Sequence, residues 1–192
     1  ADAVDTDAAV LQGCGLVVLA LPLDRLLDPP AELLAALPAG AVVTDVGSVK
    51  APVLRRWRGR ERFVASHPMA GTAEAGVEAG IPGLFQDRPW VATPEADTDP
   101  DALAAVRQLA DTVGARWLTC EAGAHDRSVA LISHLPVLLG AALIEAAAAG
   151  GAEDGAGELV RALASSGFAD TSRVGGGNPE LGTLMARCNR EA

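Results

Sequence analysis

His67 is the residue of this sequence that is best suited to exchange a proton. It follows a short apolar run, 62–65, that is typical of the end of a buried strand, and Pro68 and Gly71 interrupt the regular chain after it. Ligands of open α/β sheets bind outside the carboxyl ends of the strands, and an imidazole titrates near neutral pH. The pattern therefore predicts a general base at His67, with an ordinary loop histidine as the alternative.

Two other side chains could complete such a site. Ser48 follows the apolar run 41–46 and a glycine, so its hydroxyl would lie where a strand ends and a helix begins. The alternative for this serine is an ordinary helix N-cap. Arg173 enters a glycine-rich loop, where a guanidinium could bind a carboxylate through two parallel hydrogen bonds. The alternative for this arginine is a solvated surface charge.

Two further histidines lie on one predicted helix, His125 beside Asp126 and His134 after Ser133. A lone histidine on an apolar helix is usually a satisfied core residue, and this alternative applies to His134. The spacing matches neither HxxxH nor HExxH, so we expect no metal site. A hydrolase built from the serine and histidine described above is conceivable, but the sequence has no GxSxG motif.

Composition describes a globular chain with few possible macromolecular partners. Of the 192 residues, 49% are hydrophobic and 21% are charged, which is enough apolar material to bury a core. The formal net charge is −10 and Lys50 is the only lysine, so we expect no nucleic-acid partner and no anionic membrane. The longest uncharged run, 128–144, contains a proline and is short for a membrane span, so it predicts a buried helix.

The cysteines indicate a reducing compartment. Cys14, Cys120 and Cys188 are odd in number and far apart, which favours neither a disulfide framework nor a zinc site. The first two lie beside predicted strands and are expected to be buried. The N-terminal residues lack a basic segment followed by an apolar one. These features favour a cytoplasmic location.

The first two thirds of the chain alternate strands with helices. This alternation predicts a mostly parallel, doubly wound (Rossmann-like) α/β sheet. The predicted strands are 15–22, 41–46, 63–66, 89–93 and 115–120, and the predicted helices are 31–37, 49–58 and 99–114.

The last third of the chain is predicted to be all-helical, which gives a domain of residues 1–122 and a second of residues 123–192. A long apolar helix at 125–149 should kink near Ile132, because Pro136 cannot donate to its carbonyl. Further helices are expected at 157–165 and 180–190, joined by a connection at 167–173 and a loop at 174–179.

Five motifs, in this order, resemble those of the prephenate/arogenate dehydrogenases of tyrosine biosynthesis. Together they span nearly the whole chain, and the stretch 165–182 is especially similar to the cyanobacterial-type arogenate dehydrogenases. The motifs are GSVK (47–50), HPMAGT (67–72), HD (125–126), SHLP (133–136) and SGFADTSR (166–173).

The resemblance implies an oxidative decarboxylation. A hydride leaves the ring carbon that bears the hydroxyl, the ring carboxylate departs as CO2, and the ring aromatises. His67 would accept the hydroxyl proton, Ser48 would lie between that histidine, the hydroxyl and the nicotinamide, and Arg173 would bind a substrate carboxylate. The resemblance also implies pocket-lining roles for Thr72, Ser133 and His134, and places Leu21 and Pro22 near the dinucleotide.

The resemblance further implies a cofactor, NADP or NAD with NADP slightly favoured, and a homodimer formed through the helical domain. Val137 replaces the second histidine of the SHLPH motif common in prephenate-using members, and Ala73 stands where some members have an acidic residue. Both departures favour arogenate over prephenate as the small-molecule substrate.

The family also begins with a strand and a GxGxxG turn that binds the pyrophosphate, and this sequence contains no such motif. We therefore expect an internal segment of the enzyme, with the C-terminal helices cut short as well. Two alternatives remain open. One is a noncatalytic protein that keeps the substrate pocket without dinucleotide binding. The other is a different two-domain dehydrogenase with a helical second domain, such as a β-hydroxyacid type.

Overall fold

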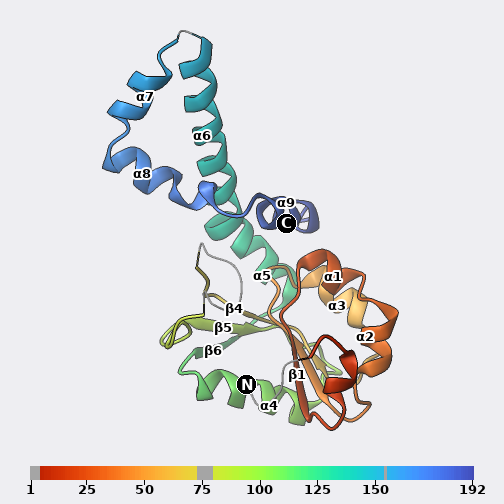
Figure 1. The fold of residues 1–192 in the computed structure, drawn as a ribbon. Coiled ribbons are helices and arrows are strands. Elements are labelled where there is room, and N and C mark those ends of the chain that lie inside the picture. Colours follow the sequence, from red (N-terminus) through yellow and green to blue (C-terminus); the bar gives the residue numbers. More distant parts are fainter. Residues whose placement is uncertain (1–4, 73–79, 154) are drawn as a thin grey trace. The chain divides into compact units, whose positions relative to one another are not determined.

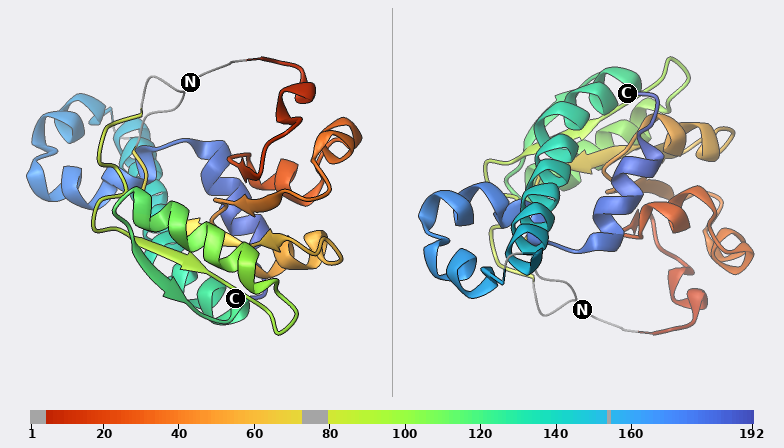
Figure 2. Two further views of the ribbon diagram at one scale, coloured as in Figure 1. Left: turned by 90° about the horizontal axis from the view of Figure 1, so that it is seen from below. Right: turned by 90° about the horizontal axis from the view of Figure 1, so that it is seen from above.

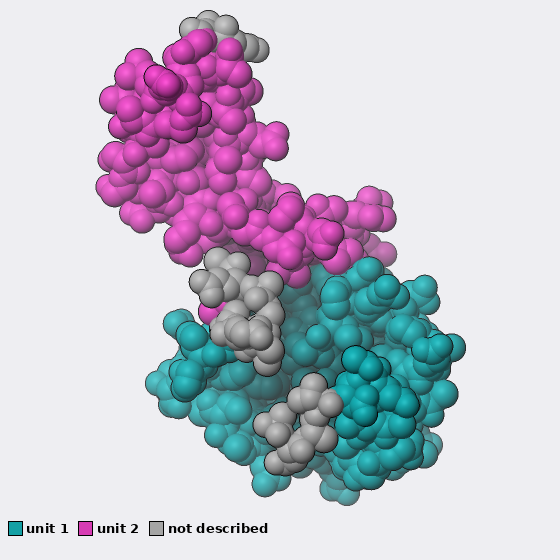
Figure 3. Space-filling model, viewed as in Figure 1, with its two compact units in different colours: residues 1–71, 80–126 teal, residues 72–79, 127–192 magenta. Residues whose placement is uncertain are grey.

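The computed structural model describes residues 5–72, 80–153 and 155–192, which divide into two compact units. Unit 1 comprises residues 1–71 and 80–126, and unit 2 comprises residues 72–79 and 127–192 (Figures 1 and 3). The boundary between residues 126 and 127 falls within one helix, α5 (Ala122–Val129).

Unit 1 contains two three-stranded sheets. In the first, β1, β2 and β3 are parallel neighbours in that order. In the second, β5 pairs antiparallel with β4 and parallel with β6. Only Ala65 separates β3 from β4, so the chain passes directly from one sheet to the other. The strands are β1 (Leu16–Leu19), β2 (Val42–Asp45), β3 (Phe63–Val64), β4 (Ser66–Pro68), β5 (Pro89–Ala92) and β6 (Arg116–Thr119).

Helices lie on both faces of the first sheet, and strands in such a position carry apolar runs such as Leu16–Leu19 of β1. On one face, Ala102 and Val106 of α4 (Pro100–Thr112) pack with Val42 and Val64. The opposite face carries α1 (Leu23–Leu27), α2 (Ala31–Ala36) and α3 (Ala51–Trp57), and Figures 1 and 2 show the strands between these helices and α4. A short 3-10 turn, η1 (Ala8–Leu11), precedes β1.

The predicted α/β fold is confirmed, but the strand that carries the candidate base differs from the prediction. His67 is the central residue of β4 and pairs with Val91, whereas the sequence predicted that it follows a strand ending at residue 66. Pro68 suggested an earlier end, because proline cannot donate to a sheet ladder. It is tolerated here because β4 is an edge strand.

Unit 2 is helical, as predicted. After α5 the helix widens into a π-helical segment, η3 (Ala130–His134), before α6 (Leu135–Glu153). This irregularity contains Ile132, the predicted kink position, and ends two residues before Pro136. The remaining elements are α7 (Gly157–Leu163), α8 (Ser166–Ser172), a 3-10 turn η4 (Arg173–Gly176) and α9 (Pro179–Cys188), with α7 and α8 packed against α6 (Figure 2).

The prediction of an irregular connection at 167–173 is wrong, because most of this stretch forms the helix α8. The first residues of the predicted loop at 174–179 belong to the turn η4. The glycine and hydroxyl residues suggested a loop. In the structure the hydroxyls bond within the helix, since Thr171 Oγ1 donates to the Gly167 carbonyl at 2.8 Å and Ser172 Oγ to the Phe168 carbonyl at 2.7 Å. The expected burial of Cys14 and Cys120 is also wrong, because both are only half-buried.

Unit 2 exposes many aliphatic side chains, so the prediction that the uncharged run 128–144 is a buried helix is wrong. Among the described residues, the helical run 122–152 is the one stretch long and apolar enough to cross a membrane by length and composition, and little of it is buried. The core helix of a soluble protein passes the same test, but such a helix is mostly covered by its own chain. The exposed aliphatic side chains of unit 2 are Leu131, Ile132, Leu135, Leu138, Leu139, Leu159, Leu163, Val174 and Leu181.

Candidate active site

The turn that carries Ser48 leaves the carboxyl edge of the first sheet. Leu19 pairs with Asp45 across β1 and β2, so the segments 20–22 and 46–48 leave that edge together. Gly47 permits close packing on α1, because a Cβ there would lie 2.8 Å from Leu26 Cδ1. The Ser48 hydroxyl is buried and has no hydrogen-bond partner among the described residues. Leu21 and Pro22, the predicted cofactor contacts, therefore share an edge with a buried hydroxyl.

A fully buried ion pair fixes this turn to β4. The Lys50 ammonium bonds to Asp45 Oδ2 and donates to the Ser66 carbonyl at 2.7 Å. The Asp45 carboxylate also accepts from the Gly47 and Ser66 amides, at 2.9 and 3.1 Å. Burial lowers the pKa of Lys50, whereas the charge and hydrogen bond of Asp45 raise it, and burial is the larger effect. The pair thus ties the backbone before Ser48 to the backbone before His67.

The hydroxyl of Ser66 adds a second set of bonds at the start of β4. Ser66 Oγ donates to the Asp45 carbonyl at 2.9 Å and accepts from Trp90 Nε1 at 3.0 Å. Thr44 Oγ1 lies 2.9 Å from the same hydroxyl and donates to the Val64 carbonyl at 2.7 Å. Because these groups are buried, they hold the strand crossing that presents His67.

His67 belongs to a chain of three side chains in unit 1. Its Nδ1 lies 3.0 Å from Nε2 of His125, and Nδ1 of His125 lies 2.8 Å from Oδ1 of Asp126. His67 is half-buried, and the other two are buried. The two imidazole rings meet edge to face, with centroids 5.2 Å apart.

Asp126 also caps the helix that follows the Ser48 turn. Its two carboxylate oxygens accept from the backbone amides of Lys50 and Ala51, at 2.7 and 2.8 Å. The alternative that Ser48 caps this helix is wrong, because Ser48 lies two residues before the N-cap Lys50, which places its hydroxyl outside the first turn. A carboxylate from α5 performs the cap instead.

The environment of Asp126 keeps it ionised. Burial raises the pKa of this carboxyl, but the hydrogen bonds from His125 and the two amides, with the charge of His125, lower it further than burial raises it. The resulting pKa lies below the ordinary value of 3.8. Asp126 therefore offers the histidine pair a fixed negative charge at neutral pH.

The other predicted site residues lie in unit 2. Ser133 and His134 end η3, and Asn189 Nδ2 donates to Nδ1 of the buried His134 at 3.1 Å, which agrees with its alternative interpretation as a core histidine. Arg173 begins η4 and is exposed. Thr72 is exposed and is the last residue before 73–79, so Ala73 lies outside the described residues.

The position of Arg173 is set by a close crossing of two backbones. A Cβ on Gly175 would lie 2.1 Å from the amide nitrogen of Ala141, and one on Gly140 would lie 2.9 Å from the amide nitrogen of Gly175. Only glycine allows η4 to approach α6 this closely. The crossing holds Arg173, two residues earlier, beside the helix that follows Ser133 and His134.

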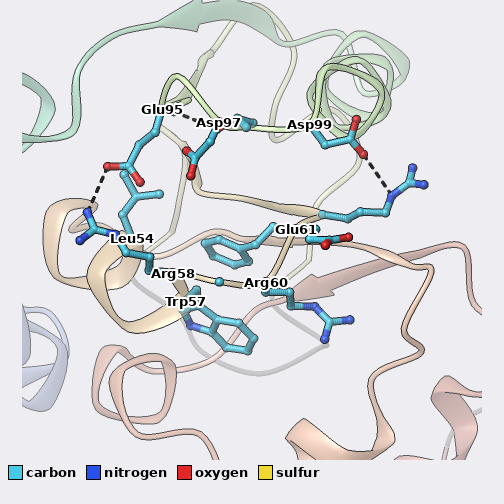
Figure 4. A pocket seen from close by; sticks show the side chains of 12 residues that line it. Leu54, Trp57, Arg58, Arg60, Glu61, Glu95, Asp97 and Asp99 are labelled. Carbon is cyan, nitrogen blue, oxygen red and sulfur yellow. Dashed lines mark hydrogen bonds and ion pairs between the residues drawn. The ribbon is translucent and has the colours of Figure 1, made fainter.

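A hollow of about 510 Å³ in unit 1 lies elsewhere (Figure 4). It is lined by the loop before β3 and by the segment after the antiparallel strand β5, so it occupies the edge of the first sheet opposite Ser48. Four of its charged side chains form surface pairs, Arg58 with Glu95 at 3.6 Å and Arg62 with Asp99 at 3.4 Å. His67, Ser48 and the other predicted site residues do not line this hollow.

Sequence reasoning gave no role to four residues that organise the site, namely Asp45, Lys50, His125 and Asp126. The sequence nevertheless carried a hint of the Asp45–Lys50 pair and of the His125–Asp126 pair. The only lysine of an acidic chain follows a strand end, and a histidine–aspartate dipeptide begins the helix that joins the domains. What the sequence could not reveal is that residue 126 binds the backbone of residues 50 and 51.

A mostly parallel α/β unit followed by a helical unit, with a histidine and a serine beside the sheet edges, agrees with the architecture of a two-domain, dinucleotide-dependent enzyme. Residues 1–119 match the family model of the prephenate dehydrogenase nucleotide-binding domain. Residues 121–192 match that of the prephenate dehydrogenase dimerization domain. The chain belongs to the prephenate dehydrogenase family.

Similar proteins agree with this assignment. The cyclohexadienyl dehydrogenase of Zymomonas mobilis is 32% identical over 86% of this chain, which spans 57% of that protein. The structure of Synechocystis arogenate dehydrogenase is 43% identical, with a TM-score of 0.74 over 97% of this chain and 67% of that one. Aquifex aeolicus prephenate dehydrogenase, solved with hydroxyphenyl propionate and NAD+, is 26% identical, with a TM-score of 0.82 over 98% and 66%. The chain thus spans little more than half of its curated relative from Zymomonas.

Proposed function

We propose that this chain carries the acid–base and substrate-binding part of a cytoplasmic arogenate dehydrogenase, which converts L-arogenate to L-tyrosine with transfer of a hydride to NAD(P)+. The observation that carries the proposal is the chain from His67 through His125 to Asp126. It holds an imidazole beside a fixed carboxylate, and the same carboxylate holds the helix that follows Ser48.

Each site residue has a role in this reaction. His67 accepts the proton of the ring hydroxyl as the hydride leaves the same carbon. Ser48, whose buried hydroxyl has no partner among the described residues, hydrogen-bonds that oxygen. Arg173 binds a carboxylate of the substrate, because an exposed guanidinium can bind it with two parallel hydrogen bonds. Thr72, Ser133 and His134 line the pocket.

Arogenate is favoured over prephenate for two reasons. The similarity to the Synechocystis arogenate dehydrogenase, at 43% identity, covers nearly the whole chain. Val137 in α6 also provides an apolar side chain where prephenate-using members commonly have a second histidine, which can carry a positive charge when protonated. Arogenate carries an amino group in place of the keto group of prephenate, so a pocket without that side chain suits it better. A prephenate dehydrogenase that yields 4-hydroxyphenylpyruvate is the alternative.

The residues present fit the nicotinamide end of a dinucleotide. Leu21, Pro22 and the buried Ser48 hydroxyl leave one carboxyl edge of parallel strands, where such ligands bind. When bound, the nicotinamide supplies the hydride acceptor, and this chain's part is to orient the ring and exclude water. We propose NADP or NAD as the cofactor, with NADP slightly favoured.

The partner of the helical unit is a second copy of this chain. Unit 2 exposes Leu131, Ile132 and Leu139 at 68, 69 and 61%, which is unusual for aliphatic side chains of one soluble helix. The match to a dimerization domain supports a homodimer through this surface. A dimer would also explain why so apolar a helix is so little covered by its own chain.

The dimer is tested by analytical ultracentrifugation. Leu139→Glu should convert a wild-type dimer to monomer, because the charge would be buried in the interface. The matched control is Leu118→Glu, whose leucine is 48% exposed but lies in β6 of unit 1. A wild-type monomer at high concentration, or a chain that sediments only with detergent, would contradict the proposal.

The activity is tested by calorimetry and steady-state assays. NADP and NAD are titrated into the 192-residue chain and into the longest natural protein that contains it, and arogenate, prephenate and a β-hydroxyacid are then compared as substrates. We expect the highest kcat/KM with arogenate. Turnover of the hydroxyacid alone would reject the proposal, and absence of binding heat with either cofactor in both proteins would favour a noncatalytic protein.

A further inference from the structure

We propose that His125 and Asp126 act together to fix the tautomer of His67, so that its Nδ1 carries the proton and its Nε2 carries the lone pair that accepts the substrate proton. Neither residue touches the reacting atoms in this scheme, so both are positioning residues. The use of the lone pair rests on the proposed function, whereas the tautomer itself does not.

The inference starts at Asp126, whose hydrogen-bond roles are fixed by its neighbours. Both of its oxygens accept from backbone amides, which can only donate, at 2.7 and 2.8 Å. An ionised carboxylate has no proton to give. The short contact of 2.8 Å from Oδ1 to Nδ1 of His125 therefore requires that this nitrogen carries the proton.

The next step follows from the chemistry of the neutral imidazole. With a proton on Nδ1, His125 has its lone pair on Nε2 and accepts there. Nε2 faces Nδ1 of His67 at 3.0 Å, so His67 must donate from Nδ1. The lone pair of neutral His67 then lies on Nε2. Asp126 thus sets the tautomer of His67 without touching it, because His125 lies between the two side chains.

The same arrangement stabilises the product of proton transfer. A proton gained by His67 creates an imidazolium that donates to His125, whose other nitrogen donates to an ionised carboxylate. Among the described residues, the titratable side chains that contact His125 in hydrogen bonds are His67 of β4 and Asp126 of its own helix. The nearby Lys50 ammonium bonds to Asp45. The ionised carboxylate of Asp126 thus ends the hydrogen-bonded series that begins at the imidazolium.

The arrangement also links the base to the serine turn. Asp126 accepts from the amide of Lys50, two residues after Ser48, with the same oxygen that faces His125. A change at Asp126 therefore disturbs both the tautomer of His67 and the start of α3. His125 touches only the histidine side of this junction in the contacts given above, so variants of the two residues can be separated.

The direct test is the tautomer of His67 in the 15N-histidine-labelled chain, measured from the ring-nitrogen shifts and couplings by nuclear magnetic resonance. The chain has three histidines, so assignment needs only single variants. We expect the Nδ1–H form for His67 in the wild type. In His125→Phe the Nε2–H form, which free imidazole side chains prefer in water, should take over. A control at His134→Asn, in unit 2, should leave His67 in its Nδ1–H form.

The functional test uses His125→Gln, which keeps an acceptor, and His125→Phe, which does not. Loss of an orienting partner should lower kcat by about 10- to 100-fold in the phenylalanine variant, with partial rescue by glutamine and a small change in KM. In Asp126→Asn the acid limb of kcat/KM should move to lower pH, because the imidazolium loses its charge partner. A variant that is merely destabilised would lose activity without moving that limb.

The outcomes separate the two proposals. An active wild type with His67 in the Nε2–H form would overturn the inference and leave the function intact. An Nδ1–H form in a chain without dehydrogenase activity would uphold the tautomer and reject the function. If His125→Phe fails to fold, the wild-type spectrum and the glutamine variant still decide the matter.

Discussion

The two units of the chain distribute polar and apolar groups in opposite ways. Unit 1 buries an ion pair, the three hydroxyl residues Thr44, Ser66 and Thr93, and the His125–Asp126 dyad. Nearly all the buried aliphatic residues among the described residues also lie in it. Unit 2 buries His134 and Ser172 but exposes nine large aliphatic side chains, against four in unit 1.

This difference agrees with two separate tasks. A buried polar network costs free energy unless its groups are paired, and in return it holds side chains in one geometry. Unit 1 therefore has the order that the proposed proton transfer needs. Exposed apolar side chains in such number are typical of a surface that contacts a partner, which agrees with the dimer proposed for unit 2.

The largest expected effect is the loss of stability when the buried ion pair of unit 1 is broken. Lys50→Met should lower the free energy of unfolding by about 3–5 kcal/mol, because it leaves the Asp45 carboxylate buried without its cation. Urea denaturation followed by circular dichroism measures this loss. The double variant Asp45→Asn with Lys50→Met should lose less than the sum of the two single changes, since no unpaired charge remains.

A surface pair provides the control for this prediction. Arg107 and Asp111 lie one helical turn apart in α4 at 3.8 Å, and both are more than half exposed. Arg107→Met should change the free energy of unfolding by less than about 0.5 kcal/mol. Similar losses for Lys50→Met and Arg107→Met would show that the buried pair does not hold the interior of unit 1.

The next largest effect is on catalysis, and it should differ between a variant in unit 1 and a variant in unit 2. His67→Asn should lower kcat by about 100-fold or more, the scale of a lost general base, with KM little changed. Arg173→Ala, in unit 2, should mainly raise KM, because it removes a carboxylate ligand rather than a proton acceptor. Steady-state kinetics of both variants in the longest natural protein that contains the chain measure the difference. Undiminished turnover in His67→Asn would show that the assigned role is wrong.

A smaller effect tests the backbone crossing in unit 2. Gly175→Ala should destabilise unit 2 by about 1–3 kcal/mol, because its Cβ would overlap the backbone of Gly140 and Ala141. It should also raise KM by displacing Arg173. Gly177→Ala is the matched control, since a Cβ there meets its nearest atom, the Val174 carbonyl, at 3.6 Å. Equal thermal stability of the two variants would contradict the role of the crossing.

Local patterns of the sequence predicted much of this architecture. The apolar runs and their spacing identified the strands and helices of the α/β unit, because strands covered on both faces leave a continuous signal. The same patterns failed at two places. Pro68 is tolerated because its strand is at the edge of a sheet. The hydroxyl residues of 167–173 form a helix because their side chains bond to backbone carbonyls within it.

The candidate site was predicted unevenly for a physical reason. His67 and Ser48 could be found because a reactive side chain near a strand end is a local feature. The roles of Asp126 and Lys50 depend on contacts across 76 and 16 residues of sequence, to the Lys50 amide and the Ser66 carbonyl. No periodicity encodes such contacts, so they required the fold.

The smallest expected effect is a pH dependence that belongs to unit 1. The pKa of Asp126 lies below 3.8 in the folded chain because hydrogen bonds from His125 and two amides outweigh its burial. A carboxyl whose folded pKa is depressed stabilises the fold above its unfolded pKa, and this contribution is lost as the pH falls through the folded value. The difference in unfolding free energy between the wild type and Asp126→Asn should therefore be largest near neutral pH and shrink below about pH 4. Asp111→Asn, on the exposed face of α4, should show a difference near zero at every pH. Urea denaturation from pH 7 to pH 3 measures both differences, and a gap that stays constant over this range would mean that the charge of Asp126 does not hold α5 to the start of α3.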